Sequence, residues 1–233
     1  MSNKTEALDL YAKIEDMLHN SEAISSLYSL YLKKLDKIEF DSFLDVGCGS
    51  GGFLELIQSV FSPKTIKGID LSPVMVSRTT ERGIDAEVVG LCDLHESYDV
   101  ITAVFDMLNY LDKAELDKFT SSVLNSLNDG GYFICDINTE YGFDQIASGS
   151  FTAEDEKQYL IIDSYYDNAI YSSYFTLFEK VGNLYRRSDE KIVQYLHIVD
   201  EISENNSLRL ISRDFVTLYG DEADKILLIF KKE

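Results

Sequence analysis

The stretch DSFLDVGCGSGGFLELIQSVFSPKTIKGIDL at 41–71 decides the fold class. SFLDV has the apolar character of a buried strand, the glycines at 47–52 indicate a tight turn, and FLELIQSVF has the apolar spacing of an amphipathic helix. TIKGIDL follows as a second strand. Short apolar strands joined by helices are typical of a parallel sheet that is covered on both faces. The stretch therefore predicts an α/β fold.

The same alternation continues toward the C-terminus. The predicted elements are a helix from Pro73 with Ser72 as its N-cap, a short strand at 85–89, a strand YDVITAVF at 98–105, a helix at 112–127 and a strand YFICDIN at 132–138. After a helix near 198–204, two further strands are expected at 208–214 and 224–231. Together these elements predict a doubly wound, mostly parallel, Rossmann-like sheet of seven strands.

Two regions outside this core have different patterns. Residues 5–37 have the apolar stripes of two amphipathic helices. Residues 141–197 contain three stretches rich in Tyr, Phe and Ile, which predict an antiparallel meander of three strands. We therefore divide the chain into an N-terminal helical lid at 1–40, a core at 41–140 and 198–233, and an inserted antiparallel sheet at 141–197.

Charge and composition exclude several classes of partner. The 41 acidic and 21 basic residues give a net charge of −20, whereas nucleic acids and anionic membranes bind clustered Lys and Arg. No apolar run approaches the roughly 18 residues of a membrane span, and the N-terminus lacks the apolar core of a secretion signal. Cysteines at 48, 92 and 135 are too scattered for a disulfide framework or a metal site. We expect a cytoplasmic protein.

The glycine turn alone leaves two ligand classes open. Gly47, Gly49 and Gly52 satisfy the G-x-G-x-x-G spacing of dinucleotide sites, and Asp70 follows at the distance expected of their ribose-binding acid. Asp45 favours a different ligand, because at the strand's end its carboxylate would repel a pyrophosphate and attract an ammonium group. At 4 Å either energy is about 1 kcal/mol in water and several-fold more near a protein surface.

Residues 41–137 resemble the core of the class I S-adenosylmethionine-dependent methyltransferases. The resemblance rests on the glycine motif at 45–51, on Asp70 after the second strand and on Asp93 after the third. It implies S-adenosylmethionine as the cofactor. The contacts that it implies are Asp45, Gly47, Cys48 and Gly49 in the glycine turn, Asp70 and Leu71 at the ribose, Asp93 and Leu94 at the adenine, and Phe105 at the methionine end. Cys48 is expected to be a small packing residue of the turn and not a nucleophile.

A second resemblance extends beyond this core. FDMLNYL at 105–111 resembles the FDxxNYL segment of small bacterial methyltransferases, which are similar in layout to sugar-amine N-methyltransferases. In these enzymes an antiparallel sheet inserted after the fifth strand covers the substrate. Asp106 is the first candidate for contacting the acceptor, as a base or as an anchor for an amine; alternatively it caps the following segment or binds the amino group of S-adenosylmethionine through water. Asn109, Tyr110 and, from the N-terminal helices, Tyr11 are expected at the same mouth.

The leading hypothesis is a methyltransferase that modifies N or O of a small-molecule acceptor. Two alternatives stay open, namely a nicotinamide-dependent oxidoreductase that uses the same glycines and a non-catalytic module that binds S-adenosylmethionine. The inserted sheet is expected to form a roof over the acceptor. Its alternative role is to pair with a second copy of the chain in a homodimer.

Overall fold

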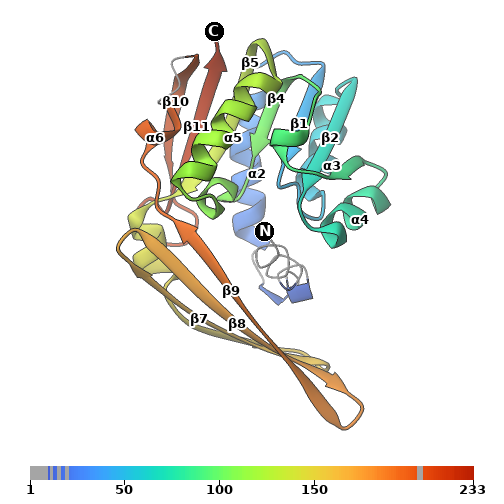
Figure 1. Ribbon diagram of the computed structural model, residues 1–233, viewed down its shortest axis with the longest axis vertical. Coiled ribbons are helices and arrows are strands. Elements are labelled where there is room, and N and C mark those ends of the chain that lie inside the picture. The colour runs from blue at the N-terminus through green and yellow to red at the C-terminus, as the bar shows by residue number, and fades with distance from the viewer. Residues whose placement is uncertain (1–9, 11–12, 15–16, 19–20, 204–206) are drawn as a thin grey trace.

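The computed structural model describes residues 10, 13–14, 17–18, 21–203 and 207–233, and these residues form two sheets (Figure 1). Sheet A has seven strands in the order β10-β11-β5-β4-β1-β2-β3, and sheet B has four strands in the order β6-β7-β8-β9. The central strands of sheet A pair in parallel, and β10 and β11 run antiparallel at one side. The predicted doubly wound α/β fold with an inserted antiparallel sheet is confirmed.

The bounds of the elements follow the sequence patterns closely. The strands of sheet A are β1 (Ser42–Val46), β2 (Thr65–Asp70), β3 (Asp85–Val88), β4 (Tyr98–Ala103), β5 (Leu127–Asn138), β10 (Leu208–Val216) and β11 (Lys225–Lys232). The α-helices are α2 (Ser21–Leu35), α3 (Gly52–Phe61), α4 (Pro73–Glu81), α5 (Lys113–Ser126) and α6 (Val199–Ser203). Three short helical turns are η2 (Leu91–Asp93), η3 (Met107–Tyr110) and the π-helical η4 (Gly142–Ala147).

Local capping chemistry fixes where two of the helices begin. Ser72 accepts a hydrogen bond from the Met75 N–H at the start of α4, and Pro73 occupies the first turn, as the sequence predicts. Asp112 and Glu115 form a reciprocal capping box at the start of α5. Both helices therefore start at positions that bring the preceding loops to the same edge of sheet A.

Sheet A separates two apolar cores. Alternate residues of its strands face α5 and α6 on one side, and the intervening residues face α2 and α3 on the other. For example, Leu44 belongs to the first core and Phe43 to the second. Burial on both faces explains why the strands contain nearly continuous apolar runs.

Sheet B projects from one end of this core (Figure 1). Its strands are β6 (Gly149–Glu154), β7 (Gln158–Asp167), β8 (Ile170–Val181) and β9 (Leu184–Tyr195). The sequence predicted a meander of three strands, and the structure has a fourth, β6. This strand was missed because it is mostly exposed and its sequence GSFTAE lacks a run of apolar residues. The positive φ angles of Asn168 and Ala169, 51° and 63°, form the tight turn between β7 and β8.

One part of sheet B is packed against described residues of the N-terminal segment. Leu10, Ile14 and Met17 share a core with four residues of the sheet. Those four are Leu160, Phe175, Leu177 and Ile192. The part of the face that contains these four residues is therefore covered, and Gln194, two residues after Ile192 on β9, contacts Asp106 at the edge of sheet A.

Candidate active site

The glycine turn after β1 has a backbone that requires glycine. Gly47, Gly49 and Gly51 have φ angles of 71°, 54° and 80°, in the left-handed region. A Cβ atom on Gly47 would lie 2.7 Å from Cγ of Met107, and one on Gly51 would lie 2.8 Å from Oγ1 of Thr79. The side chains of Met107 and Thr79 occupy the space that these Cβ atoms would need, so the turn can pack this closely only with glycine at these positions.

Asp70 holds this turn in place from the end of β2. Its Oδ2 accepts a hydrogen bond from the Gly49 N–H at 3.0 Å, and its Oδ1 accepts one from the Ser72 N–H at 2.8 Å. The residue that was expected at the ribose therefore also connects the glycine turn to the start of α4.

Asp45 is a buried carboxyl group at the end of β1. It is 2% exposed, and its Oδ1 accepts a hydrogen bond from Oγ1 of Thr102 at 2.6 Å. Burial raises the pKa of Asp45 to about 7; the Thr102 hydroxyl opposes this rise, and the charges of Asp70 and Asp136 add to it. Near neutral pH this group therefore exchanges readily between its neutral and charged forms.

An exposed apolar patch lies beside the acid that follows β3. Leu71 is 50% exposed, and Asp93 is exposed at the end of η2. Both approach Gly90, because a Cβ atom built there would lie 3.9 Å from Oδ2 of Asp93 and 4.0 Å from Cδ2 of Leu71. Leu94, which follows Asp93 in the sequence, is half-buried. An apolar surface next to a carboxylate suits a flat heterocycle that carries an amino group.

Two consecutive residues after β4 have left-handed backbones. The φ angles are 56° at Phe105 and 51° at Asp106, which side-chain-bearing residues rarely adopt. The buried carboxylate of Asp136 fixes this turn, because Oδ1 accepts the Phe105 N–H at 2.8 Å and Oδ2 accepts the Asp106 N–H at 2.9 Å. The Tyr31 hydroxyl also donates to Oδ1, at 2.8 Å. Strain of this kind is common at functional sites.

Lys225 partly neutralises the negative charges of Asp106 and Asp136. This residue was not identified from the sequence. Its Nζ lies 2.6 Å from Oδ1 of Asp106, 2.8 Å from Oδ1 of Asn138 and 3.1 Å from Oδ2 of Asp136. Burial disfavours the charged ammonium, but Asp106 and Asp136 outweigh it and raise the pKa of Lys225. One signal was available, since Asp136 stands inside the apolar strand YFICDIN and a buried acid needs a partner.

Comparison with known families and curated proteins agrees with this geometry. Residues 43–131 match a family model described as a methyltransferase domain, over the segment that contains Asp45, Asp70 and Asp93. The chain contains a methyltransferase domain. This match favours the methyltransferase hypothesis over the oxidoreductase.

Two curated relatives are described as malonyl-[acyl-carrier protein] O-methyltransferases. The one from Acetivibrio thermocellus is 27% identical over 123 residues, which cover 47% of this chain and 39% of the relative. The one from Anoxybacillus flavithermus is 29% identical over 66 residues, which cover 26% of each. The chain thus matches about a quarter to two fifths of the length of these relatives.

Solved structures resemble the whole chain, including sheet B. An S-adenosylmethionine-dependent methyltransferase from Clostridium acetobutylicum has a TM-score of 0.75 at 23% identity, with 96% of both chains covered. The sugar N-methyltransferase KedS8 from Streptoalloteichus has a TM-score of 0.71 at 17% identity, with 97% of this chain and 92% of that chain covered. For CalS10, an amino pentose methyltransferase from Micromonospora echinaspora, the values are 0.68 and 17%, with coverage of 96% and 97%. The methyltransferase fold therefore extends beyond the matched domain.

Three further residues were expected at the acceptor side, and they differ in burial and in their contacts. Asn109 is fully buried; its Nδ2 donates to the Tyr195 carbonyl at 2.7 Å, and its Oδ1 accepts the Asn138 N–H at 3.0 Å. Tyr110 is half-buried and packs on the core that joins sheet B to the N-terminal segment. Tyr11 lies outside the described residues. Asn109 thus connects η3 to both β9 and β5.

Sheet B is attached to the edge of the methyltransferase domain by residues at the end of β9. Nε2 of Gln194 donates to Oδ2 of Asp106 at 2.6 Å. The buried His197 places its Nε2 at 3.2 Å from the Leu108 carbonyl and at 3.0 Å from the Leu111 carbonyl. These contacts, with that of Asn109, hold the inserted sheet against the FDMLNYL segment.

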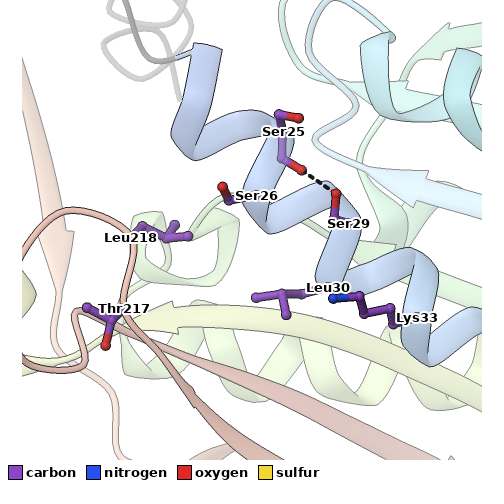
Figure 2. Close-up of a pocket in the computed structure, with 7 residues that line it drawn as sticks. All are labelled: Ser25, Ser26, Ser29, Leu30, Lys33, Thr217 and Leu218. Atoms are coloured by element: carbon purple, nitrogen blue, oxygen red, sulfur yellow. Dashed lines mark hydrogen bonds between the residues drawn. The ribbon is translucent and has the colours of Figure 1, made fainter.

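A separate surface hollow lies away from these residues (Figure 2). It has a volume of about 380 Å³ and is lined by Ser25, Ser26, Ser29, Leu30 and Lys33 of α2 together with Thr217 and Leu218 after β10. None of the expected site residues lines it. Within the described ranges, no helix is both long enough and apolar enough to span a membrane.

Proposed function

We propose that this protein transfers a methyl group from S-adenosylmethionine to a nitrogen or oxygen atom of a small-molecule acceptor. The observation that carries the proposal is the row of carboxylates at the ends of β1, β2 and η2, beside a glycine turn. Among the solved structures of this fold, CalS10 is described as bound to S-adenosylmethionine and NodS as a complex with S-adenosylhomocysteine. Those ligands have no phosphate and suit an acidic site.

The proposed cofactor contacts follow the strand ends in order. Asp45 would pair with the methionine ammonium, Asp70 would accept hydrogen bonds from the ribose hydroxyls, and Asp93 would accept one from the adenine amino group. The remaining proposed contacts are the turn residues Gly47, Cys48 and Gly49, the apolar Leu71 and Leu94 around the adenine, and Phe105 at the methionine end.

The residues present fit this cofactor better than a dinucleotide. A pyrophosphate placed 4 Å from the Asp45 carboxylate would be repelled by about 4 kcal/mol per charge pair at an effective dielectric constant of 20. An ammonium group at the same place gains a similar energy and lowers the pKa of Asp45, which burial has raised to about 7. The free site is therefore prepared for a cationic group.

On the acceptor side, the chain would mainly align the reactants and exclude water. When bound, S-adenosylmethionine supplies an electrophilic methyl group on a positively charged sulfur. Asp106, whose side chain is 19% exposed, is proposed to contact the acceptor, and Asn109 and Tyr110 are proposed to shape the same region. We also assign Tyr11 to this region as a proposal.

We further propose that the inserted segment 141–197 forms a roof over the acceptor and that residues 1–40 form a lid. The hydrogen bond from Gln194 to Asp106 and that from Asn109 to Tyr195 support the roof, because both join β9 to the acceptor side. Pairing of sheet B with a second copy is the alternative. We place the protein in the cytoplasm, without a nucleic-acid partner, because of its net charge of −20 and its free cysteines.

Two measurements test the proposed function. Calorimetry should show binding of S-adenosylmethionine and S-adenosylhomocysteine but no binding of NAD or NADP. Transfer of a labelled methyl group should then be followed on amino sugars, hydroxylated sugars and malonyl-acyl carrier protein, and a labelled product from one panel identifies the acceptor class. Binding of NAD with no binding of S-adenosylmethionine would overturn the proposal, and cofactor binding without turnover on any panel would favour the non-catalytic module.

A further inference from the structure

The acceptor side contains a buried charge cluster that the proposed function does not itself require. Asp106 has a hydrogen-bond donor on each carboxylate oxygen, Lys225 on Oδ1 and Gln194 on Oδ2, both at 2.6 Å. The two donors come from β11 and β9, far apart in the sequence. We propose that Lys225 is a positioning residue that fixes the Asp106 carboxylate, so that Asp106 stabilises the positive charge that reaches an acceptor nitrogen and does not act as a general base.

Lys225 is itself held rigidly. Its side chain is 4% exposed, and its ammonium group has three oxygen partners, one each from Asp106, Asp136 and Asn138. An ammonium group has three hydrogens to donate, so all three are directed at oxygens. The pairing of Lys225 with Asn138 in the β11–β5 register fixes the backbone behind these contacts.

The charges of the cluster do not cancel. Asp106 and Asp136 contribute two negative charges and Lys225 one positive charge, which leaves one negative charge. Asp136 is fully buried, and Tyr31, Phe105, Asp106 and Lys225 surround its two oxygens. Asp106 is the member whose side chain is partly exposed, so the surplus charge faces outward at this residue.

A fixed anion at this place fits transfer to an amine, in an inference that rests on the proposed function. The neutral amine uses its lone pair to form the new N–C bond, while the C–S bond breaks and its electron pair goes to sulfur. The positive charge therefore moves from sulfur to nitrogen, and a nearby carboxylate stabilises it as it arrives. The acceptor loses a proton to solvent before it binds, and Asp106 takes no proton. A hydroxyl acceptor would instead need a base.

Among the described residues, two tyrosines that interact with Asp106 stay neutral near neutral pH. These are Tyr171 on β8 and Tyr219 between β10 and β11, and the charge of Asp106 contributes to the raised pKa of each. Burial raises the pKa of both phenols above the ordinary value of 10.0. A change in binding between about pH 6 and 8 therefore does not come from these tyrosines.

The test uses two cofactor analogues and no acceptor. Sinefungin has a carbon bearing a primary amine in place of the methylated sulfur, whereas S-adenosylhomocysteine is uncharged at that point. The ratio of their dissociation constants, measured by calorimetry at pH 6, 7 and 8, isolates the charge near the acceptor. Titration of Asp45 affects the amino-acid end that both ligands share and cancels in the ratio.

We expect the wild type to prefer sinefungin by at least tenfold at all three pH values. Asp106→Asn should abolish the preference. Lys225→Met should lose most of it, because the Asp106 carboxylate then lacks the ammonium group that orients it; Lys225→Arg should restore it. Lys231→Met, at the other end of β11, is the matched control and should behave as wild type.

Each other result has a definite meaning. If the wild type binds neither ligand, the proposed function fails. If it binds both ligands equally, or if its preference falls as the pH drops from 8 to 6, Asp106 is not a fixed anion and the inference is overturned while the proposed function stands. Should Lys225→Met fail to fold, the wild-type and Lys225→Arg profiles decide in the same way.

Discussion

The carboxylates at the two halves of the sheet A edge are balanced in different ways. On the β1–β2 side, Asp45 receives a hydrogen bond from a hydroxyl group and Asp70 receives bonds from backbone N–H groups. On the β4–β5 side, Asp106 and Asp136 contact the ammonium of Lys225. The difference teaches that a shared strand-end position does not imply a shared environment, because the acids of one side accept hydrogen bonds from hydroxyl and backbone N–H groups and those of the other side also contact a buried ammonium group.

Removing the internal cation should give the largest effect on stability. Lys225→Met leaves Asp136 buried without its ion pair, and breaking a buried pair typically costs about 3–5 kcal/mol. Urea unfolding at pH 7 should show a loss of this size. Lys231→Met is the control and should change the free energy of unfolding by less than about 0.5 kcal/mol. A loss below about 1 kcal/mol in Lys225→Met would show that the two sides do not differ.

On the other side, removing a carboxylate should increase stability. Burial raises the pKa of Asp45 from 3.8 to about 7, so the folded protein retains a proton that the unfolded chain releases. The contribution of Asp45 to stability is therefore present at low pH and is lost as the pH rises through about 7. Asp45→Asn should stabilise the protein at pH 8 by about 1–4 kcal/mol, at about 1.4 kcal/mol per pKa unit, and should have little effect at pH 4.

Thermal melts of Asp45→Asn and wild type across this pH range provide the measurement. A gain of 1 kcal/mol corresponds to a rise in the melting temperature of about 2–4 °C for a chain of this length. The same variant should lose affinity for S-adenosylmethionine, because the amide cannot pair with its ammonium. A variant that is equally stable at pH 4 and pH 8 relative to wild type would contradict the raised pKa.

A smaller effect on cofactor binding is expected at Asp70, whose side chain also connects the glycine turn to the start of α4. Asp70→Ala removes charge-assisted hydrogen bonds to the proposed ribose, which should weaken S-adenosylmethionine binding by about 1–3 kcal/mol. Calorimetry on the folded variant measures this loss. Asp85→Ala, at the exposed start of β3, is the control and should bind like wild type. Unchanged affinity in Asp70→Ala would remove the ribose assignment.

The smallest expected effect is a null result with nucleic acid. At a net charge of −20 and with no basic run longer than a pair, the protein should not retain DNA or RNA at physiological salt. A gel-shift titration measures this directly. Submicromolar binding that weakens with added salt would contradict this expectation, because it would require a basic surface.

The sequence predicted those features that depend on neighbouring residues. The apolar strands, the Ser72 cap and the glycine turn follow from local spacing, and Asp45 and Asp70 follow because parallel strands end at one edge. Lys225 was missed because its partner Asp106 is 119 residues away in the chain, and Gln194 was missed because Asp106 is 88 residues away. Strand β6 was missed because it is mostly exposed and pairs without an apolar pattern.

The place of β11 between β5 and β10 has a consequence for synthesis on the ribosome. Asn138 ends β5 and Lys232 ends β11, so 232 − 138 = 94 residues must emerge before the edge of β5 is fully covered. At ~5–20 residues per second this takes about 5–19 s. Sheet B, whose strands pair in sequence order, emerges complete within that interval. The nascent chain therefore has its inserted sheet before its central sheet closes, and Asp106 gains its lysine only after sheet B has emerged.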